Sequence, residues 1–198
     1  MTVGLLGGAF DPPHRGHVEL ARDALSRFGL ERLVVVVTGR APHKLVETGA
    51  ETRLRLAEAA FGGLDGVEVS RWEIDRADPS YTVDTVRWAN DRWDDVAFVV
   101  GADEFCHFLD WKDPDGLLEH ARLLVASRPG FPHERLDRVL AGLARPERVE
   151  FFEIQPLPIS SREIRSRVAR GEPIDDLVLP AVVNLIEELG LYRTSEGS

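Results

Sequence analysis

Residues 3–17 read VGLLGGAFDPPHRGH, a short apolar run that meets a glycine pair and continues into a loop with two prolines and two histidines. A short apolar run bounded by glycine is typical of a buried strand that ends in a tight turn. Apolar residues then recur at spacings of three, four and three, which predicts an amphipathic helix over 18–28 that Gly29 closes. The stretch therefore predicts a strand, a loop and a helix in succession.

The rest of the chain repeats this alternation. Apolar, β-branched runs predict strands over 33–37, 67–74, 96–100, 123–126 and 149–154. Helical spacing predicts helices over 51–61, 82–93, 134–143, 161–170 and 180–189. Alternating strands and helices favour an α/β fold, a Rossmann-like doubly wound parallel sheet with helices on both faces in a single domain. In such folds ligands bind outside the carboxyl ends of the strands, where the strand order reverses.

Composition narrows the class of protein. The chain has 198 residues, of which 43% are hydrophobic and 29% charged, and this suits one globular domain, expected over 1–193 with a disordered tail at 194–198. A net charge of −10 disfavours nucleic acid as a partner. The lone Cys106 has no second cysteine to pair with, and we expect it to be a small buried hydrophobe. No signal peptide or membrane span is recognisable, so we expect a cytoplasmic protein.

The loop after the first strand concentrates the residues suited to chemistry. Gly7 and Gly8 allow backbone N–H groups to approach a ligand. His14 and His17 are three residues apart and would share one face at the start of a helix, while Gly16 leaves room for a ligand between them. A glycine turn, a helix N-terminus and two imidazoles together predict an anion site. A structural histidine pair is the alternative, and a metal site would need a third ligand that the nearby sequence does not supply.

A dinucleotide-binding dehydrogenase is a rival of another reaction class. Its G-x-G-x-x-G fingerprint is absent, because Gly4, Gly7 and Gly8 have the wrong spacing. The second strand also runs into Thr38 and Gly39 instead of the acid that would hold a ribose. The sequence therefore disfavours this class.

Residues 159–165, ISSREIR, form a second segment of interest. Ser160 followed three residues later by Glu163 is a capping box, which by itself would explain both residues structurally. A helix N-terminus with serine hydroxyls and the Arg165 guanidinium could also hold the β- and γ-phosphates of a nucleotide. Both interpretations stay open at this level.

The two segments together resemble the signatures of one family. GGAFDPPHRGH is similar to the G-G-x-F-D-P-x-H-x-G-H signature of the HxGH nucleotidyltransferases, and ISSREIR is similar to their I-S-S-T-x-I-R. Arg162 stands where that family has threonine, and it either contacts a phosphate or faces solvent. The resemblance implies catalytic roles for His14, His17 and Arg165. It implies ATP-binding roles for Gly7, Gly8, Ala9, Phe10, Gly16, Ser160, Ser161 and Arg165.

The middle of the chain narrows the acceptor. The stretch 78–85 (DPSYTVDT), Gly101–Asp103 with Trp111, 127–130 (SRPG) and 190–192 (GLY) resemble segments of nicotinate-nucleotide adenylyltransferases. Phosphopantetheine adenylyltransferases and archaeal nicotinamide-mononucleotide enzymes match less well. The resemblance implies a mononucleotide site that contains Lys44, Tyr81, Thr82, Asp103, Trp111 and Arg128.

The chemistry of a nicotinate acceptor suits these residues. Trp111 or Tyr81 could stack on a pyridinium ring, backbone N–H groups near Thr82 could bind its carboxylate, and Asp103 could accept from a ribose. Each residue also has a structural alternative: core packing for Trp111, a surface ring for Tyr81, a helix cap for Asp103 and a solvated side chain for Lys44.

The implied reaction joins nicotinate mononucleotide to ATP and gives nicotinate adenine dinucleotide and pyrophosphate. Mg²⁺ is expected to accompany ATP through its phosphates, without a dedicated protein metal site. A sister transferase with another acceptor and a non-catalytic nucleotide-binding protein remain alternatives. A homo-oligomer is compatible with the sequence, which does not set the oligomeric state.

Overall fold

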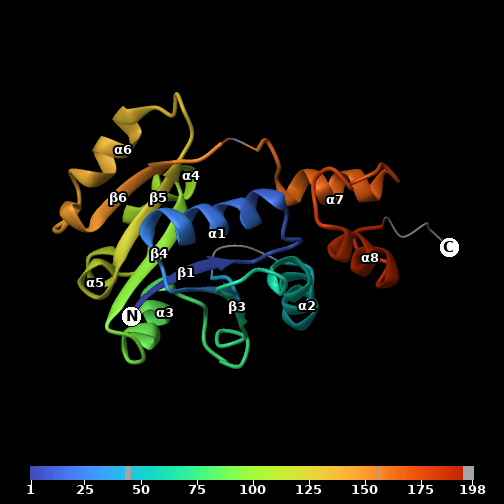
Figure 1. Ribbon diagram of the computed structural model, residues 1–198, viewed down its shortest axis with the longest axis horizontal. Helices are drawn as coiled ribbons and strands as arrows, with labels where there is room; N and C mark the ends of the chain where they lie inside the picture. Colours follow the sequence, from blue (N-terminus) through green and yellow to red (C-terminus); the bar gives the residue numbers. More distant parts are fainter. Residues whose placement is uncertain (43–45, 156, 194–198) are drawn as a thin grey trace.

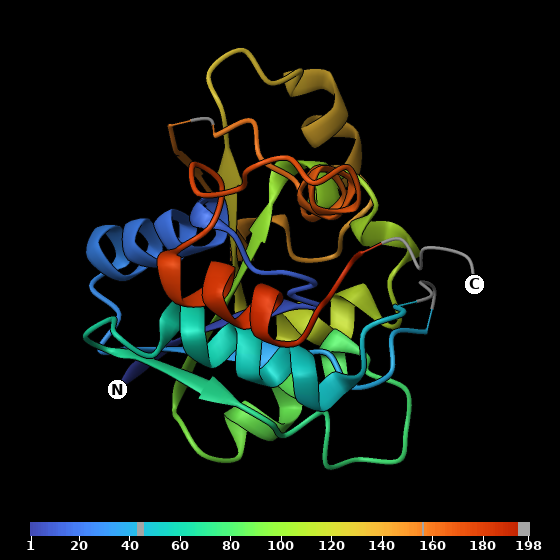
Figure 2. The same ribbon diagram turned by 90° about the vertical axis from the view of Figure 1, so that its right-hand side faces the viewer.

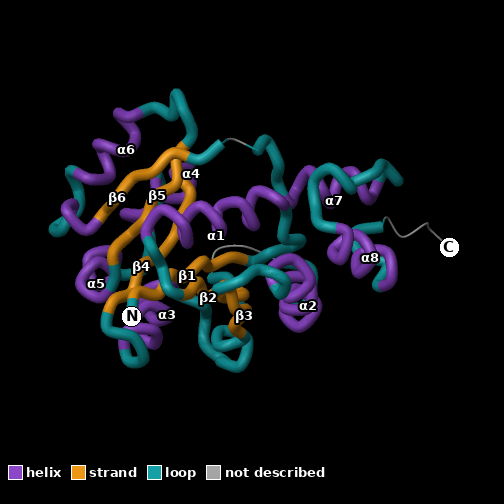
Figure 3. Tube along the Cα trace, viewed as in Figure 1, coloured by secondary structure: helices purple, strands orange, loops and turns teal. Residues whose placement is uncertain are grey.

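The computed structural model describes residues 1–42, 46–155 and 157–193, so the expectations for Lys44 and for a tail at 194–198 lie outside the described residues. Its centre is one sheet of six strands in the order β3-β2-β1-β4-β5-β6 (Figures 1 and 3). All neighbouring strands are parallel. The strands are β1 (Thr2–Gly8), β2 (Arg32–Val37), β3 (Val67–Ser70), β4 (Asp95–Gly101), β5 (Arg122–Ser127) and β6 (Val149–Glu153). The predicted parallel α/β fold is confirmed.

Helices cover both faces of the sheet. One hydrophobic cluster joins Leu6 and Val35 to the helices α1 (Arg15–Phe28), α2 (Ala50–Phe61), α7 (Ser161–Ala169) and α8 (Pro180–Glu188). A second cluster joins Leu5 and Val34 to α3 (Thr82–Asn90), α4 (Ala102–Phe105), α5 (Pro114–His120) and α6 (His133–Leu140). Successive strand residues point to opposite faces, so the apolar runs of β1 and β2 serve both clusters. Figure 2 shows α8 beside α2, and an ion pair joins the two helices, with 3.5 Å between Arg55 Nη2 and Glu188 Oε1.

The strand order reverses between β1 and β4. Both strands lie at the centre of the sheet, and they end at Gly8 and Gly101. The loops that follow them diverge to helices on opposite faces, which leaves space above the strand ends. The β1–α1 loop (residues 9–14) begins at this point.

Several elements differ from the sequence expectation. The strand predicted over 67–74 ends at Ser70, because Arg71 accepts hydrogen bonds from the N–H groups of Ile74 and Asp75 and the chain turns. Between β4 and β5 the structure adds α4, the 3₁₀ turn η1 (Phe108–Asp110) and α5, which are too short for a clear helical period. A second 3₁₀ turn, η2 (Pro146–Arg148), precedes β6.

The two helix ends predicted at glycines are reproduced, whereas the helices predicted over 82–93 and 134–143 end at Asn90 and Leu140. Gly29 and Gly190 have φ angles of 57° and 61°, the left-handed region that closes helices and that glycine adopts without strain. Cys106 is half-buried instead of buried, although it does pack against the second cluster. Within the described ranges, no helix has the length and apolar character needed to cross a bilayer.

Candidate active site

The N-terminus of α1 holds two stacked imidazoles. His14 is the N-cap residue and His17 lies in the first turn, as the spacing predicts, and their ring centroids are 3.7 Å apart at an interplanar angle of 24°. The His14 backbone N–H donates to His17 Nδ1 over 3.2 Å. A neutral imidazole that accepts at Nδ1 carries its proton at Nε2. His17 can therefore donate from Nε2 to a ligand.

Both histidines lie in a poorly hydrated environment. Burial lowers the pKa of His14 to about 4. The pKa of His17 is held well below its usual range, first by burial and then by repulsion from the His14 charge. The edge of the buried Phe10 ring packs against His17, with ring centroids 5.2 Å apart. At neutral pH the pair consists of uncharged, half-buried hydrogen-bonding groups.

One ring nitrogen of this pair has no partner. His14 Nδ1 is buried and makes no hydrogen bond to any of the residues that the structure describes. A Cβ on residue 16 would lie 3.1 Å from the same atom, so Gly16 also allows the close approach of the His14 ring. An unpartnered buried polar atom is costly, and a bound ligand atom would remove that cost.

The backbone carbonyls of the β1–α1 loop are drawn away from the histidines. Three of them, together with the last carbonyl of β1, accept hydrogen bonds from other segments: Gly8 O from Thr38 N–H at 2.9 Å, Ala9 O from Arg53 Nη1 at 2.9 Å, Asp11 O from Arg165 Nη1 at 2.6 Å, and Pro12 O from Ser161 Oγ at 2.8 Å. Carbonyl oxygens engaged in this way cannot repel an anion in the loop. The arrangement suits a phosphate bound by N–H groups.

Arg53 on α2 is a buried residue beside the site that sequence reasoning missed. Only 2% of it is exposed, and its guanidinium donates to the carbonyls of Thr48, Ala9 and Gly39. Burial lowers its pKa, while the neighbouring Asp11 opposes that shift. The available signal was an arginine on the apolar face of a predicted helix, where a charged residue needs partners.

Tyr192 closes the loop from the other end of the chain. Its hydroxyl donates to Asp11 Oδ1 over 2.6 Å, and burial together with this bond raises its pKa. Its backbone has a φ of 61°, which costs energy for a non-glycine residue and requires support from its contacts. A cavity of about 160 Å³, the loop cavity, is lined by Ala9, Asp11, Val46, Glu47, Thr48, Arg165 and Tyr192.

The N-terminus of α7 has a different design. Ser160 caps the helix by accepting from the Glu163 N–H at 3.1 Å, but the Glu163 carboxylate bonds Arg167 at 3.3 Å instead of completing the predicted capping box. The hydroxyl proton of Ser161 is donated to Pro12 O. Arg162 is exposed. The first turn of α7 is therefore hydrogen-bonded to the β1–α1 loop through the Ser161 hydroxyl.

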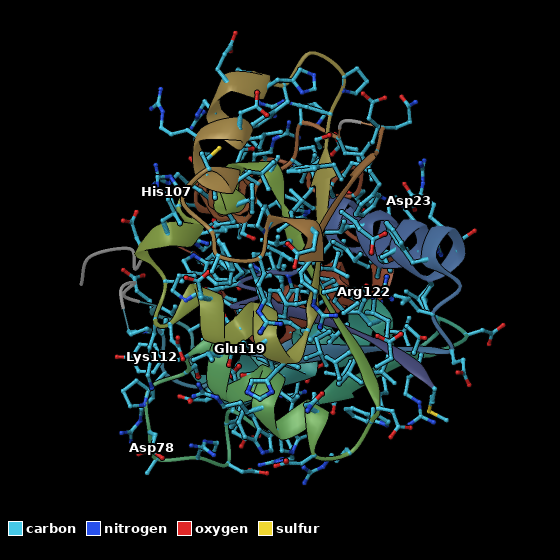
Figure 4. The ribbon with its side chains drawn as sticks, turned by 90° about the vertical axis from the view of Figure 1, so that its left-hand side faces the viewer. Asp23, Asp78, His107, Lys112, Glu119 and Arg122 are labelled. Atoms are coloured by element: carbon cyan, nitrogen blue, oxygen red, sulfur yellow. The ribbon has the colours of Figure 1, made fainter. Side chains whose placement is uncertain are left out.

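A second cavity lies beside the start of α3. This α3 cavity, of about 230 Å³, is lined by Thr38, Ala41, Pro42, Ser80, Tyr81, Thr82, Glu104, Trp111 and Lys112. Trp111 packs edge-on against Phe98 and Phe108, so it belongs to both the core and the cavity wall. Lys112 Nζ lies 4.2 Å from the centre of the Tyr81 ring. Lys112 and Asp78 project from the side of the molecule opposite to Asp23 of α1 (Figure 4).

Backbone donors are available at this cavity. Tyr81 is the N-cap residue of α3, and its carbonyl accepts from the N–H groups of Asp84 and Thr85. The N–H groups of Thr82 and Val83 have no acceptor in the parts of the chain that the structure describes. Two unpaired donors at a helix N-terminus are suited to a carboxylate.

The two remaining predicted residues lie apart from the α3 cavity walls. Asp103 is in the first turn of α4, whose N-cap is Gly101, and it faces Arg128 with 4.0 Å between Oδ2 and Nη1. Both side chains are more than half exposed. Over residues 1–42, 46–155 and 157–193, no group of three histidine, cysteine or acidic residues could hold a metal ion.

Comparison with known proteins identifies relatives of the whole chain. The cytidylyltransferase-like family model matches residues 5–167. A probable nicotinate-nucleotide adenylyltransferase of Thermus thermophilus is 40% identical over 195 residues, which cover 98% of this chain and all of the relative. A similarly named protein of Rubrobacter xylanophilus is 38% identical over 198 residues, 98% of this chain and 92% of the relative.

Solved structures agree on the fold. A Plasmodium falciparum nicotinic acid mononucleotide adenylyltransferase complexed with NaAD has a TM-score of 0.79 and 17% identity over 96% of this chain and 97% of its own. The sheet order, the two signature loops and the full-length relatives agree with one another. The chain therefore belongs to the cytidylyltransferase-like family, within the group of the nicotinate-nucleotide adenylyltransferases.

Proposed function

We propose that the protein transfers the adenylyl group of ATP to nicotinate mononucleotide, with the α-phosphate of ATP bound at the β1–α1 loop. The observation that carries this is the pair of half-buried, neutral imidazoles beside a loop whose carbonyls are engaged elsewhere. Hydrogen-bond donors that are fixed in advance in a dry site stabilise developing charge without reorganisation. The protein is accordingly an enzyme of the nucleotidyltransferase class.

In this reaction an oxygen of the acceptor phosphate forms a bond to the α-phosphorus of ATP, and the bond to the pyrophosphate oxygen breaks. The acceptor phosphate is already nucleophilic at neutral pH, so alignment and charge stabilisation supply the catalysis. His17 would donate from Nε2 to the transferred phosphate, and His14 would contact the phosphate being released. Gly7, Gly8, Ala9 and Phe10 would bring the backbone close to the nucleotide.

Arg165 and the start of α7 would meet the tail of the triphosphate. One Arg165 nitrogen is used on Asp11 O, and its remaining donors border the loop cavity. While the Ser161 hydroxyl donates its hydrogen bond to Pro12 O, it can accept a hydrogen bond but cannot donate one to a phosphate. A hydrogen bond from Ser161 to phosphate would therefore require the bond to Pro12 O to break. Ser160 would contribute its place at the helix N-terminus.

Mg²⁺ would bind through the phosphates of ATP and water. The donors gathered here are imidazoles, guanidinium groups and backbone amides, which suit anions, whereas Mg²⁺ prefers oxygen ligands. Asp11, the carboxylate of the loop, has one oxygen occupied by Tyr192. The metal would screen phosphate charge, and the residues named above would orient the phosphates.

The α3 cavity would hold the nicotinate ring. Trp111 and Tyr81 supply aromatic faces, Lys112 lies over the Tyr81 ring while its ammonium group pairs with Asp84 at 3.0 Å, and the N–H groups of Thr82 and Val83 would bind the carboxylate. A carboxamide would turn its NH₂ toward one of these donors and leave it unpaired. An unsatisfied buried donor costs roughly 1–3 kcal/mol. Asp103 would bind the ribose of the mononucleotide, and Arg128 would bind its phosphate.

The enzyme would act in the cytoplasm, where ATP is available.

The test is pyrophosphate release by the purified protein with ATP, Mg²⁺ and a panel of mononucleotides. We expect kcat/KM for nicotinate mononucleotide to exceed that for the amide by at least about tenfold, or 1.4 kcal/mol. Equal values would remove the nicotinate assignment and leave adenylyl transfer standing. No release with any acceptor would instead support a non-catalytic nucleotide-binding protein.

A pair of tryptophan variants locates the ring. Trp111→Ala should raise KM for the mononucleotide by about tenfold, because a stacked aromatic face contributes roughly 0.5–1.5 kcal/mol beyond its buried area. Trp93→Phe is the matched control, since Trp93 packs on Trp88 and not on the α3 cavity. A wild-type KM in Trp111→Ala would place the ring elsewhere.

A further inference from the structure

Glu73 has no place in the chemistry above, yet it is only 7% exposed. It lies in the turn that follows β3, and its carboxylate accepts a hydrogen bond from the Thr85 hydroxyl of α3. Burial raises its pKa, and hydrogen bonds from Thr85, Ser80 and the Gly39 backbone oppose that rise. An acid that is this buried and this well bonded connects the segments around it.

Ser80 joins the same cluster from two sides. Its Oγ accepts from the backbone N–H groups of Gly39 at 3.1 Å and Arg40 at 3.2 Å, and its own N–H donates to Arg40 O at 2.8 Å. With both acceptor positions of the Ser80 oxygen occupied, its hydroxyl proton is available to donate a hydrogen bond to the Glu73 carboxylate. The loop after β2 is thus bonded directly to the residue that precedes Tyr81.

The backbone of Gly39 lies against Glu73. A Cβ at position 39 would be 2.1 Å from the Glu73 carbonyl oxygen, closer than any side chain tolerates. Arg53 holds the Gly39 carbonyl from the other side at 3.2 Å. These contacts therefore hold the loop after β2 in one position, and Glu73 forms part of the surface against which it packs.

The segments that Glu73 connects form two adjoining walls of one cavity. Thr38, Ala41 and Pro42 come from the loop after β2, whereas Ser80, Tyr81 and Thr82 come from the start of α3, and both groups line the α3 cavity. We propose that Glu73 is a positioning residue of the acceptor site, which sets the separation of these walls and the direction of the Thr82 and Val83 N–H groups through Ser80 and Thr85. This inference rests on the proposed function, because it gives those N–H groups the role of selecting an acid over an amide.

Thr85 provides a matched pair of variants. Thr85→Val keeps the shape and removes the hydroxyl, whereas Thr85→Ser keeps the hydroxyl and removes a methyl group. We expect Thr85→Val to raise KM for nicotinate mononucleotide by about tenfold and to reduce the acid-over-amide preference by a similar factor. KM for ATP should stay within about twofold. Thr85→Ser should recover most of both acceptor values.

Glu73→Gln is a second route to the same result, since an amide has one acceptor oxygen for the Thr85 and Ser80 hydroxyls where the carboxylate has two. Thermal unfolding of each variant separates folding from positioning. A rise in KM for ATP equal to that for the acceptor, or equal acceptor values in Thr85→Val and Thr85→Ser, would overturn the proposal. The proposed function is tested separately on the wild-type protein, because its failure would appear there as an absent or unselective reaction before any variant is compared.

Discussion

The N-termini of α1 and α7 both come to the β1–α1 loop, but they serve it differently. At α1 the two imidazoles have free hydrogen-bonding atoms, and His14 Nδ1 lacks any partner among the described residues. At α7 the side chains of Ser161 and Arg165 already bond the loop backbone. In the proposed reaction, α1 would supply groups for the reacting phosphates, while α7 would mainly fix the loop that presents them.

The largest expected effect is at α1. His17→Ala should fold normally and lose about 10²–10³ in kcat, because it removes one prearranged donor to a charged transition state. Single-turnover pyrophosphate release measures the loss, and circular dichroism checks the fold. A folded variant with nearly wild-type kcat would mean that α1 is not the reacting side of the comparison.

We also expect His14, at the N-terminus of α1, to make the free energy of unfolding depend on pH. The His14 pKa is about 4 in the folded protein and about 6.5 when unfolded, so the unfolded state binds more protons between these values. Stability should therefore fall as pH drops from 6.5 to 4, by up to about 3 kcal/mol from His14. Urea unfolding of wild type and His14→Asn at several pH values isolates this contribution. Parallel curves for the two proteins would contradict it.

Arg165→Lys tests whether α7 also contacts the nucleotide. A lysine keeps the charge but cannot bond Asp11 O and a phosphate with one planar group, so KM for ATP should rise by about tenfold and KM for the mononucleotide by less. Initial rates at varied ATP and varied acceptor separate the two. The opposite pattern would assign Arg165 to the acceptor.

The smallest effects are expected from substitutions of Ser160 and Ser161, the adjacent serines at the N-terminus of α7. Ser161→Ala removes the bond to Pro12 O and should cost about 1 kcal/mol of stability with a few-fold loss of kcat, whereas Ser160→Ala removes the helix cap at a similar cost in stability and leaves kcat near wild type. Chemical unfolding and steady-state rates compare them. Equal kcat values would show that the Ser161 bond does not fix the reactive loop.

The sequence predicts the parts of the site that rest on local pattern. The spacing of His14 and His17, the start of α7 at Ser160 and the alternation of strands all follow from periodicity and capping, and the structure reproduces them. The aromatic wall at Trp111 was also anticipated, although the residue proves to serve the core as well. Local signals persist because each depends on neighbours within one turn or one strand.

The parts that the sequence could not predict depend on distant partners. The bonds from Arg53 to Ala9 and from Tyr192 to Asp11 join residues far apart in the chain, and no spacing rule encodes such pairs. Glu73 was placed in a strand, because nothing local shows that the chain turns after Ser70 to bury it. The close approach of the His14 ring to Gly16 likewise depends on the folded loop, so the sequence did not reveal it.

The Tyr192–Asp11 hydrogen bond has a consequence for synthesis on the ribosome. The two residues are 181 positions apart, so β1 and its loop leave the ribosome long before the tyrosine that closes them is made. Until then Asp11 lacks its partner, and α7 is not yet present to bond Asp11 O and Pro12 O. The β1–α1 loop therefore reaches its finished geometry only when residues up to 192 have been translated and folded.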